Sequence, residues 1–384
     1  MNRSPLLDTS GAIGHPDGED VDAPDAAVAA HFGDPFAEQR SASRNAVVVD
    51  RSHRGVVVVD GADRLSWLHL LVSQQVADLP EGSGTEGLVL DVQGRVEHHA
   101  VMSHVGGRVW LDVEPGTAPA LASYLESMTF WSAVTVRDAT EEFAVLSLLG
   151  PDVSEVLTAA GVELPAGDAG PLGAGTHGGA EPDPAGGIVR RKDWPEHAVD
   201  LVVPRAGLVD WWERLRGAGA APAGLDAFEA LRVASLRPRL GSDTDDRTIP
   251  HEVGWIGSAV HLSKGCYRGQ ETVSRVANLG RPPRQMVLLH LSSMEDALPP
   301  PGTPVLSAEG GRAVGRIGTA VRHHELGAVA LALVKRSAVS GGAELWVADD
   351  RDEGTPGPAT VDPDSVPPDT GEPPGRAAVR RLQG

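Results

Sequence analysis

The sequence predicts an α+β protein of two or three domains that ends in a small all-β domain. The chain has 384 residues, and a domain usually holds roughly 100 to 200 residues. Between residues 45 and 284, short β-branched runs alternate with segments that carry apolar residues at helical spacing. Between residues 285 and 348, short strands separated by Gly and Pro follow one another without a helix, which is typical of a barrel or sandwich.

Composition excludes several classes of protein. The net charge is −20, which disfavours broad contact with a nucleic-acid backbone. A single cysteine excludes an intramolecular disulfide framework and a four-cysteine metal site. The adjacent pairs His98–His99 and His323–His324 give no metal-ligand spacing, so no metal is expected. Neither an export segment nor an apolar run of about 18 residues is found, so we expect a cytoplasmic protein without a membrane span.

The first α+β domain is expected over residues 45–140. The apolar side chains of Leu65, Leu68 and Leu71 recur at helical spacing, and the turn around Gly94 is typical of a hairpin. Strands are expected at residues 45–49, 55–60, 87–92, 95–104, 108–113 and 134–137, and helices at residues 63–72 and 119–128.

The second α+β domain is expected over residues 141–284. Asp226 and Glu229 have the spacing of a capping box at the start of a helix that ends at Pro238. Residues 165–187 are rich in Gly, Pro and Ala and predict an exposed loop insertion. Strands are expected at residues 143–149, 188–191 and 198–203, with further helices at residues 152–160 and 208–215.

The C-terminal β-domain and the two chain ends complete the predicted organisation. Strands are expected at residues 287–291, 304–307, 313–319 and 328–334. Residues 1–44 are acidic and show no periodicity, which predicts a disordered tail. Residues 349–384 are Pro-rich and acidic and predict a linker or tail, with a possible last strand at residues 376–382.

The segment Lys264–Glu271 concentrates the rarest residue types of the chain. It holds the only cysteine, Cys266, together with Tyr267, one of two tyrosines, and Lys264, one of three lysines. Lys264 and Arg268 would favour the thiolate of Cys266 and make it a nucleophile. The alternative is a buried, inert cysteine, since free cysteine is among the most buried residue types. The polar side chains that complete the expected catalytic group are Gln270 and Glu271.

Lys264–Glu271 resembles the K-G-C-Y-x-G-Q-E signature of the YgfZ family of folate-binding proteins, which are relatives of the glycine cleavage T-protein, an aminomethyltransferase. The resemblance extends over residues 45–340. The segments that carry it are Ile249–Trp255, similar to a P-x-E-x-G segment, Gly280–Arg284, Gly55–Leu71 and the hairpin Leu90–Val96. The fold it implies has two α+β domains that form a folate cavity and a C-terminal antiparallel β-barrel.

The resemblance also implies a cofactor, tetrahydrofolate or a one-carbon derivative. Glu252 matches the glutamate that holds the pterin ring, and a carboxylate suits that task because it accepts two parallel N–H bonds. Arg281 matches an arginine that contacts folate and would pair with its carboxylates. The alternatives are a capping or surface carboxylate for Glu252 and a solvated loop charge for Arg281.

The hairpin departs from the T-protein pattern. The T-protein carries an aspartate pair there, and the corresponding positions in this chain are Glu97 and His98. Glu97 would serve as a base and His98 would titrate near neutral pH, and we count both among the cofactor-binding residues. The alternative is that both are exposed strand residues. The missing aspartate argues against aminomethyl transfer.

Three functions follow from the resemblance. The leading one is a folate-binding accessory protein for iron–sulfur cluster assembly or repair, with iron–sulfur client enzymes or assembly proteins as partners and an indirect link to tRNA modification. The second is a tetrahydrofolate-dependent aminomethyltransferase or methyltransferase, and whether the chain is an enzyme stays open. The third is a binding module in which folate only stabilises the fold.

Overall fold

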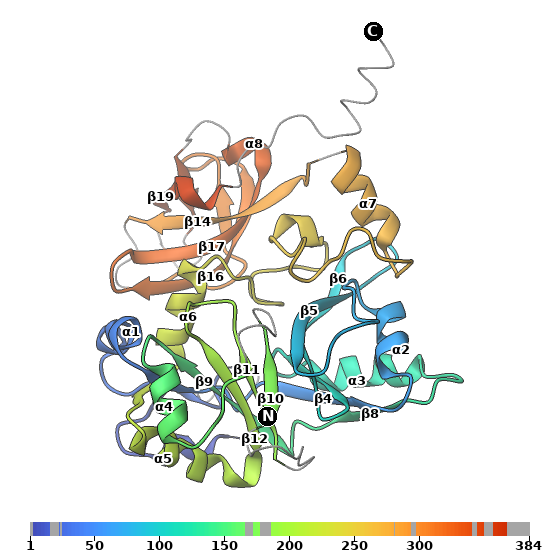
Figure 1. Ribbon diagram of the computed structural model, residues 1–384. Helices are drawn as coiled ribbons and strands as arrows, with labels where there is room; N and C mark the ends of the chain where they lie inside the picture. Colours follow the sequence, from blue (N-terminus) through green and yellow to red (C-terminus); the bar gives the residue numbers. More distant parts are fainter. Residues whose placement is uncertain are drawn as a thin grey trace. The chain divides into compact units, whose positions relative to one another are not determined.

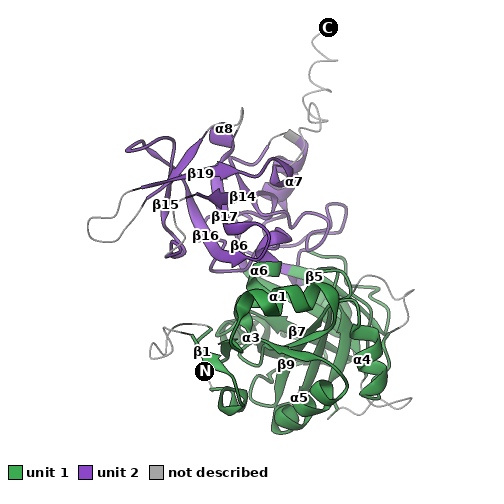
Figure 2. Cartoon of the chain, turned by 90° about the vertical axis from the view of Figure 1, so that its left-hand side faces the viewer, with its two compact units in different colours: residues 1–70, 74–87, 98–231 green, residues 71–73, 88–97, 232–384 purple. Residues whose placement is uncertain are grey.

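The computed structural model shows two compact units (Figure 1; Figure 2). Unit 1 holds residues 1–70, 74–87 and 98–231, and unit 2 holds residues 71–73, 88–97 and 232–384. The residues that the structure describes are 3–15, 23, 25–165, 172–176, 186–279, 281–292, 297–339, 344–348 and 356–366.

The larger sheet of unit 1 has six strands in the order β10-β11-β12-β9-β3-β13. Only β13 pairs in parallel, with β3. Every residue of β9 is buried, as expected for a continuous apolar run inside a sheet covered on both faces. The strands are β3 (Val47–Asp50), β9 (Phe143–Leu149), β10 (Ala174–Thr176), β11 (Ile188–Arg191), β12 (Val199–Pro204) and β13 (Ala221–Ala223).

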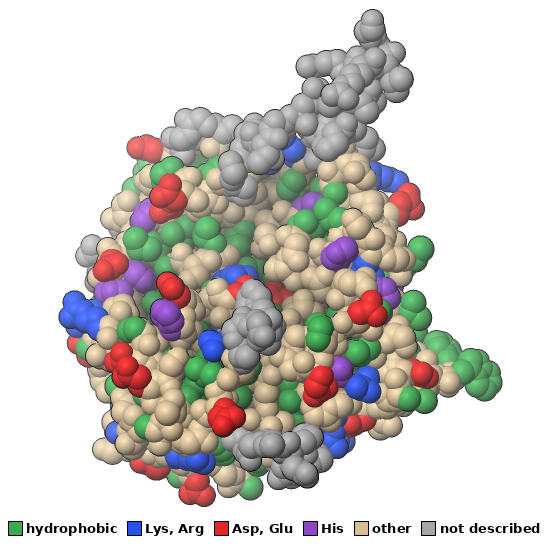
Figure 3. Space-filling view, in the orientation of Figure 1, with side chains coloured by type: hydrophobic (Ala, Val, Ile, Leu, Met, Phe, Trp, Pro, Cys, Tyr) green, Lys and Arg blue, Asp and Glu red, His purple; other side chains and the backbone are tan. Residues whose placement is uncertain are grey.

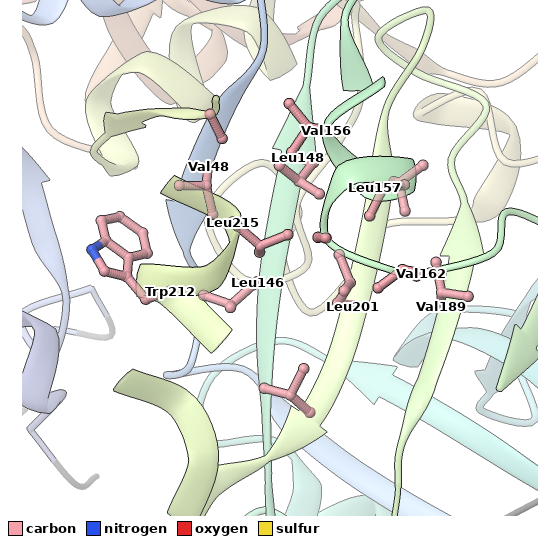
Figure 4. Close-up of a cluster of buried hydrophobic side chains, with 14 of the residues drawn as sticks. Val48, Leu146, Leu148, Val156, Leu157, Val162, Val189, Leu201, Trp212 and Leu215 are labelled. Carbon is pink, nitrogen blue, oxygen red and sulfur yellow. The ribbon is translucent and has the colours of Figure 1, made fainter. Parts of the chain in front are cut away.

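Two helices cover one face of this sheet, α4 (Val153–Ala159) and α5 (Leu208–Gly217). Their apolar stripes pack on alternate residues of the strands, and Trp212 is fully buried among them (Figure 4). The labelled side chains of this core are Val48, Leu146, Leu148, Val156, Leu157, Val162, Val189, Leu201, Trp212 and Leu215.

A second sheet has five strands in the order β5-β6-β7-β4-β8. Its β-branched runs face the opposite side of the six-stranded sheet in a shared apolar cluster that includes Val56, Trp110 and Val145. The strands are β4 (Gly55–Asp60), β5 (Ser83–Leu90), β6 (Val96–Val105), β7 (Arg108–Val113) and β8 (Thr135–Asp138), and the neighbouring helices are α2 (Arg64–Leu71) and α3 (Ala118–Ser127).

Unit 2 holds a closed antiparallel barrel in the order β14-β17-β16-β15-β18-β19. Inward-facing Val, Leu, Ile and Ala side chains fill it. The strands are β14 (Arg284–Leu291), β15 (Pro304–Leu306), β16 (Ala313–His323), β17 (Gly327–Lys335), β18 (Leu345–Val347) and β19 (Gly357–Val361). The helical elements of unit 2 are the 3₁₀ turn η4 (Pro250–Glu252), α7 (Gln270–Leu279) and α8 (Arg336–Val339), while α6 (Leu225–Ala234) begins in unit 1 and ends in unit 2.

The predicted α+β fold with a C-terminal antiparallel barrel is confirmed. The six-stranded sheet combines strands from both predicted α+β domains. β3, placed by the sequence at the start of the first domain, pairs with β9 and β13 of the six-stranded sheet. The cause is long-range strand pairing, which local sequence patterns do not encode.

The prediction of a disordered tail over residues 1–44 is wrong for the described part of that segment. It contains η1 (Pro5–Asp8), β1 (Ile13–Gly14), β2 (Ala29–His31) and α1 (Pro35–Arg44). Leu6 and Val28 are fully buried in the cores of unit 1, and the Glu38 carboxylate accepts hydrogen bonds from Phe32 N at 2.6 Å and Gly224 N at 2.8 Å. A few buried contacts therefore order the described part of a segment that shows no hydrophobic periodicity.

Two further predictions need correction. Residues 349–384 were expected to form a linker or tail, yet β19 closes the barrel by pairing with β14 and β18 and is followed by η5 (Pro363–Ser365). The predicted loop insertion at 165–187 contains β10, which pairs with β11. The possible strand at 376–382 lies outside the described residues.

Within the described ranges of the chain, no helix is long and apolar enough to cross a membrane.

Candidate functional site

The β5–β6 hairpin ends in a tight turn at Asp91–Gly94, which lies within residues 88–97 of unit 2. The Asp91 carboxylate accepts hydrogen bonds from Gln93 N and Arg95 N, each at 2.8 Å, which is the geometry of an Asx turn. Gly94 has a φ of +79°, a conformation that side chains disfavour. The predicted hairpin turn is therefore present and fixed by its own side chain.

This turn packs backbone to backbone on the Lys264–Glu271 segment. Gly269 has a φ of +82°, and a Cβ atom there would lie 2.5 Å from Asp91 O and 2.8 Å from the Gly94 Cα. A Cβ atom on Gly94 would lie 2.9 Å from the Thr272 Cβ. Both positions need glycine, because any side chain would force the two turns apart. The structure thus brings together two segments that the sequence singled out separately.

Lys264 faces the interior of unit 2. Its ammonium group donates a hydrogen bond to Val72 O at 2.5 Å and lies 5.0 Å from the centre of the Tyr267 ring. Burial lowers the pKa of Lys264 to about 8, because an ammonium ion loses hydration inside the protein. Lys264 therefore anchors the segment to residues 71–73 of the same unit.

Tyr267 also points inward, and its side chain is only 8% exposed. Among the described residues its hydroxyl has no hydrogen-bond partner. Burial raises the pKa of Tyr267 to about 12, so the hydroxyl stays protonated at neutral pH. A buried hydroxyl without a partner is costly to the fold and is a group that a bound polar molecule would satisfy.

Cys266 lies between these two inward residues and is exposed. The cation expected to assist it on the other side, Arg268, forms an ion pair with Glu97 at 2.8 Å between Nη1 and Oε2. The positive charges of Lys264 and Arg268 are thus already held by other groups. The alternative of a buried Cys266 is wrong, because the residue is exposed, and its reactivity stays a prediction.

Gln270 and Glu271, the remaining predicted catalytic residues, begin helix α7. The Gln270 amide donates to Lys264 O at 3.1 Å and closes the loop on itself. Glu271 is highly exposed and pairs with Arg275 one helical turn later at 2.8 Å. Both contacts shape or extend the helix, and the catalytic role of these two residues stays a prediction.

Glu252 is buried in η4 and held by an arginine fork. Arg284 Nε donates to Oε1 at 2.9 Å and Arg284 Nη2 donates to Oε2 at 2.7 Å, while Ile249 N donates to Oε2 at 3.2 Å. Arg284 also donates a hydrogen bond to the Asp245 carboxylate. Burial alone would raise the pKa of Asp245, but hydrogen bonds from Arg284 and Thr248 lower it to about 2. The carboxylate edge proposed for a pterin is therefore occupied by Arg284.

Other predicted binding residues have different surroundings. Arg281 is exposed. His98, in unit 1, has its ring centre 6.3 Å from that of Tyr124, and burial lowers its pKa. The neighbouring His251, which the sequence analysis did not single out, has both ring nitrogens inaccessible and without a partner among the described residues, and burial lowers its pKa to about 4.

Unit 1 contains a buried charged cluster that the sequence analysis missed. The five-stranded and six-stranded sheets face each other across an apolar cluster. On several strands the residue two positions away from a member of that cluster points to the same side and is charged or polar. The pairs are Val56 and Arg54, Trp110 and Asp112, Val145 and Ser147, Ile188 and Arg190, and Val202 and Asp200.

Asp200 is the centre of this cluster and is fully buried. It accepts from Ser147 Oγ at 2.6 Å, from Arg190 Nη2 at 2.6 Å and from Lys192 Nζ at 3.2 Å. Arg190 also bonds Asp112, which bonds Arg54 in turn. Burial opposes the charge of Asp200, but the cations around it hold its pKa well below the ordinary value. The sequence does contain one signal of this cluster, because charged residues occur at alternate positions in strands that are otherwise apolar.

Lys192 adds a pH-dependent charge to this cluster. Its side chain is 8% exposed and its ammonium lies 4.7 Å from the Trp194 ring centre. Burial, with help from nearby Arg51 and Arg190, lowers the pKa of Lys192 from 10.5 to about 8, although Asp200 opposes this. Above pH 8 the folded protein therefore loses a proton that the unfolded chain keeps up to about pH 10.5.

The free energy of unfolding should consequently rise with pH between 8 and 10.5, by up to about 3 kcal/mol from this residue. Urea unfolding of the wild type and of Lys192→Met at pH 7.5, 8.5 and 9.5 measures the effect. We expect the wild type to gain stability relative to the variant across this series. A difference between the two proteins that stays constant with pH would show that Lys192 has an ordinary pKa.

The mixed α+β sheets and the closed six-stranded barrel define a T-protein-like fold. The structure resembles the glycine cleavage system aminomethyltransferase T from Bartonella henselae, with a TM-score of 0.75 at 18% identity, over 93% of this chain and 94% of that one. The sequence matches the GCVT N-terminal domain family over residues 29–264. The chain belongs to that family.

Two relatives named aminomethyltransferase show the same relationship in sequence. The protein of Herpetosiphon aurantiacus is 27% identical over 319 residues, which is 81% of this chain and 85% of the relative. The protein of Rubrobacter xylanophilus is 32% identical over 231 residues, which is 59% of this chain and 60% of the relative. The predicted relationship to the aminomethyltransferases is thus confirmed, and the assignment to the YgfZ branch stays a prediction.

Proposed function

We propose that this protein is a YgfZ-type folate-binding relative of the aminomethyltransferases that supports iron–sulfur cluster assembly or repair through Cys266. One observation carries the proposal: Lys264 and Tyr267 are buried while Cys266 between them is exposed, and glycine packing fixes their loop on the Asp91–Gly94 turn. A loop that is rigid and presents one sulfur to solvent suits reaction with another macromolecule. The support for tRNA modification would be indirect, through the client enzymes.

The polar groups of unit 2 fit a folate only in part. The Tyr267 hydroxyl and the His251 ring nitrogens are buried polar atoms without partners among the described residues, and a polar heterocycle would satisfy such atoms. Glu252 would hold a pterin edge only by giving up bonds to Arg284. Arg281, exposed and cationic, suits the carboxylates of the folate tail. Tetrahydrofolate, when bound, would supply a carrier for a one-carbon group.

Cys266 would act on a partner and not hold a cluster by itself. A [4Fe–4S] cluster takes four cysteine ligands, and this chain has one cysteine. The other ligands would come from an iron–sulfur client or assembly protein. Cys266 would then serve as a transient ligand, or would exchange a one-carbon or sulfur group with the client.

The second candidate is a tetrahydrofolate-dependent aminomethyltransferase, and the named relatives favour it. The geometry of the hairpin favours it less. Glu97, the candidate proton carrier, is paired with Arg268, and burial lowers the pKa of His98. Incubation with tetrahydrofolate and an aminomethylated carrier protein separates the two candidates, because only a transferase forms methylene-tetrahydrofolate.

Calorimetry with tetrahydrofolate tests the folate proposal. We expect the wild type to bind and Tyr267→Phe to bind about tenfold more weakly, because the variant loses one hydrogen bond of about 1.4 kcal/mol. Tyr124→Phe, which changes the other tyrosine of the chain, is the matched control and should bind like the wild type. A wild type that gives no binding heat would contradict the proposal. Equal affinity of Tyr267→Phe and wild type would remove Tyr267 from the binding residues.

A further inference from the structure

The loop that follows α3 exposes two adjacent aromatic side chains. Trp131 is 100% exposed and Phe130 is 78% exposed, the highest values among the large hydrophobic residues that the structure describes. In Figure 1 the loop after α3 projects from the edge of the ribbon, and Figure 3, in the same orientation, shows hydrophobic side chains projecting there. We call Phe130–Trp131 the aromatic tip.

The base of the aromatic tip is tied on both sides. The Trp67 indole donates to Met128 O at 2.8 Å, and Ala133 N donates to the Asp63 carboxylate at 2.7 Å. Within the loop, Ser132 N donates to Thr129 O at 2.8 Å. These bonds come from α2 and from the segment before it, so the loop is held by its own unit. The aromatic side chains are presented on a fixed support.

The backbone of the tip is strained. Phe130 has a φ of +40°, in the left-handed region that residues with a bulky side chain rarely adopt. Strain of this kind persists only where the surrounding structure imposes it, and it concentrates at functional sites. The turn with this backbone leaves both rings in solvent.

We propose that the aromatic tip is the anchor of a docking site for a protein partner that presents an apolar pocket rimmed by basic side chains. Tryptophan in the centre of an interface contributes strongly to affinity, because a large rigid surface is removed from water. Two exposed carboxylates of this chain, Asp63 and Glu126, lie beside the tip and would face the basic side chains around the partner's pocket. The adjacent Arg64 guanidinium bonds Gly61 O and His104 and keeps its positive charge, so it offsets one of the two carboxylates and leaves the surroundings of the tip net acidic.

Charge separates this partner from the other occupants of an exposed tryptophan. An anionic bilayer would be repelled by the two carboxylates and by a chain of net charge −20. A second copy of this chain would bring the same acidic rim against itself in a symmetric dimer. A basic rim on a different protein complements both charges and speeds association.

Site-specific photocrosslinking in the source cells identifies the partner. One full-length variant carries a photoreactive phenylalanine analogue in place of Trp131, and the control carries it in place of Val209, an exposed residue of α5 in the same unit. The crosslinked protein is then purified, and its affinity for the wild type, Trp131→Ala and Glu126→Lys is measured by calorimetry. Flotation with phosphatidylglycerol vesicles and sedimentation of the wild type measure membrane binding and self-association.

We expect a crosslinked protein at position 131 and not at 209, and about 30-fold weaker binding by Trp131→Ala. Glu126→Lys should weaken binding severalfold at low salt and less at high salt. Trp131→Ala should unfold like the wild type, because the side chain is fully exposed. Equal crosslinking at both positions, unchanged affinity of Trp131→Ala, or tip-dependent binding to vesicles or to a second copy would overturn the proposal.

Discussion

Replacing Asp200 by Asn should lower the free energy of unfolding by about 3 to 5 kcal/mol, the largest effect expected from a single conservative change in this chain. Asp200 has no exposed surface and accepts hydrogen bonds from Ser147, Arg190 and Lys192. The amide is of similar size but removes the negative charge. Lys192 and Arg190 would then lose their nearest shared counter-charge, and Asp112 would remain to compensate these two buried cations.

Urea unfolding of Asp200→Asn at pH 7 measures this loss. The matched control is Glu196→Gln, which makes the same chemical change on an exposed carboxylate of the same unit, and should stay within about 0.5 kcal/mol of the wild type. A second variant, Arg190→Met, should also be destabilised, because it leaves Asp112 and Asp200 short of a partner. A loss below about 1 kcal/mol for Asp200→Asn would show that the cluster is hydrated or carries fewer charges.

Replacing Gly269 by Ala should destabilise the loop of Cys266 by about 2 to 4 kcal/mol. Part of the effect is the left-handed backbone, which costs a side chain about 1 to 2 kcal/mol, and part is the clash with Asp91 O and Gly94. Relief of the clash requires the hairpin turn and the Cys266 loop to separate. The same substitution would therefore also reduce the activity that depends on this loop.

Gly265→Ala is the matched control in the same segment. A Cβ atom on Gly265 meets nothing within 4 Å, so this variant should stay within about 0.5 kcal/mol of the wild type. Hydrogen exchange at residues 91–97 and 264–271 reports the local effect. We expect faster exchange in both segments for Gly269→Ala only. Equal exchange in the two variants would mean that the two turns do not depend on each other.

Much of the fold follows from local sequence patterns. The Gly55–Asp60 strand has the predicted bounds, since a run of valines ends at charged residues on both sides. By contrast, β13 (Ala221–Ala223) has little β-propensity and forms only by pairing with β3, far away in the sequence. The structure of the described residues within 1–44 likewise depends on distant contacts, such as Ser4 Oγ with Asp50 at 2.5 Å.

The candidate site could be predicted in its residues but not in its geometry. Rare residue types identified Lys264, Cys266 and Tyr267, but which of them faces solvent depends on Val72 O, nearly two hundred residues earlier in the chain. The match of Glu252 to a pterin-binding residue gave no sign of Arg284, which occupies its carboxylate. Spacing predicts which residues occur together in the chain, whereas tertiary packing decides what each one contacts.

Rescue of cells that lack this protein, by wild type or by Cys266→Ala, tests the central claim most directly. Iron–sulfur enzyme activity is measured in both, with Ser263→Ala, an exposed neighbour in the same loop, as control. The account predicts that Cys266→Ala is present at normal levels and unfolds like the wild type, because the residue is exposed, yet restores no activity, whereas Ser263→Ala restores it. Full rescue by Cys266→Ala would contradict the proposed role of the thiol.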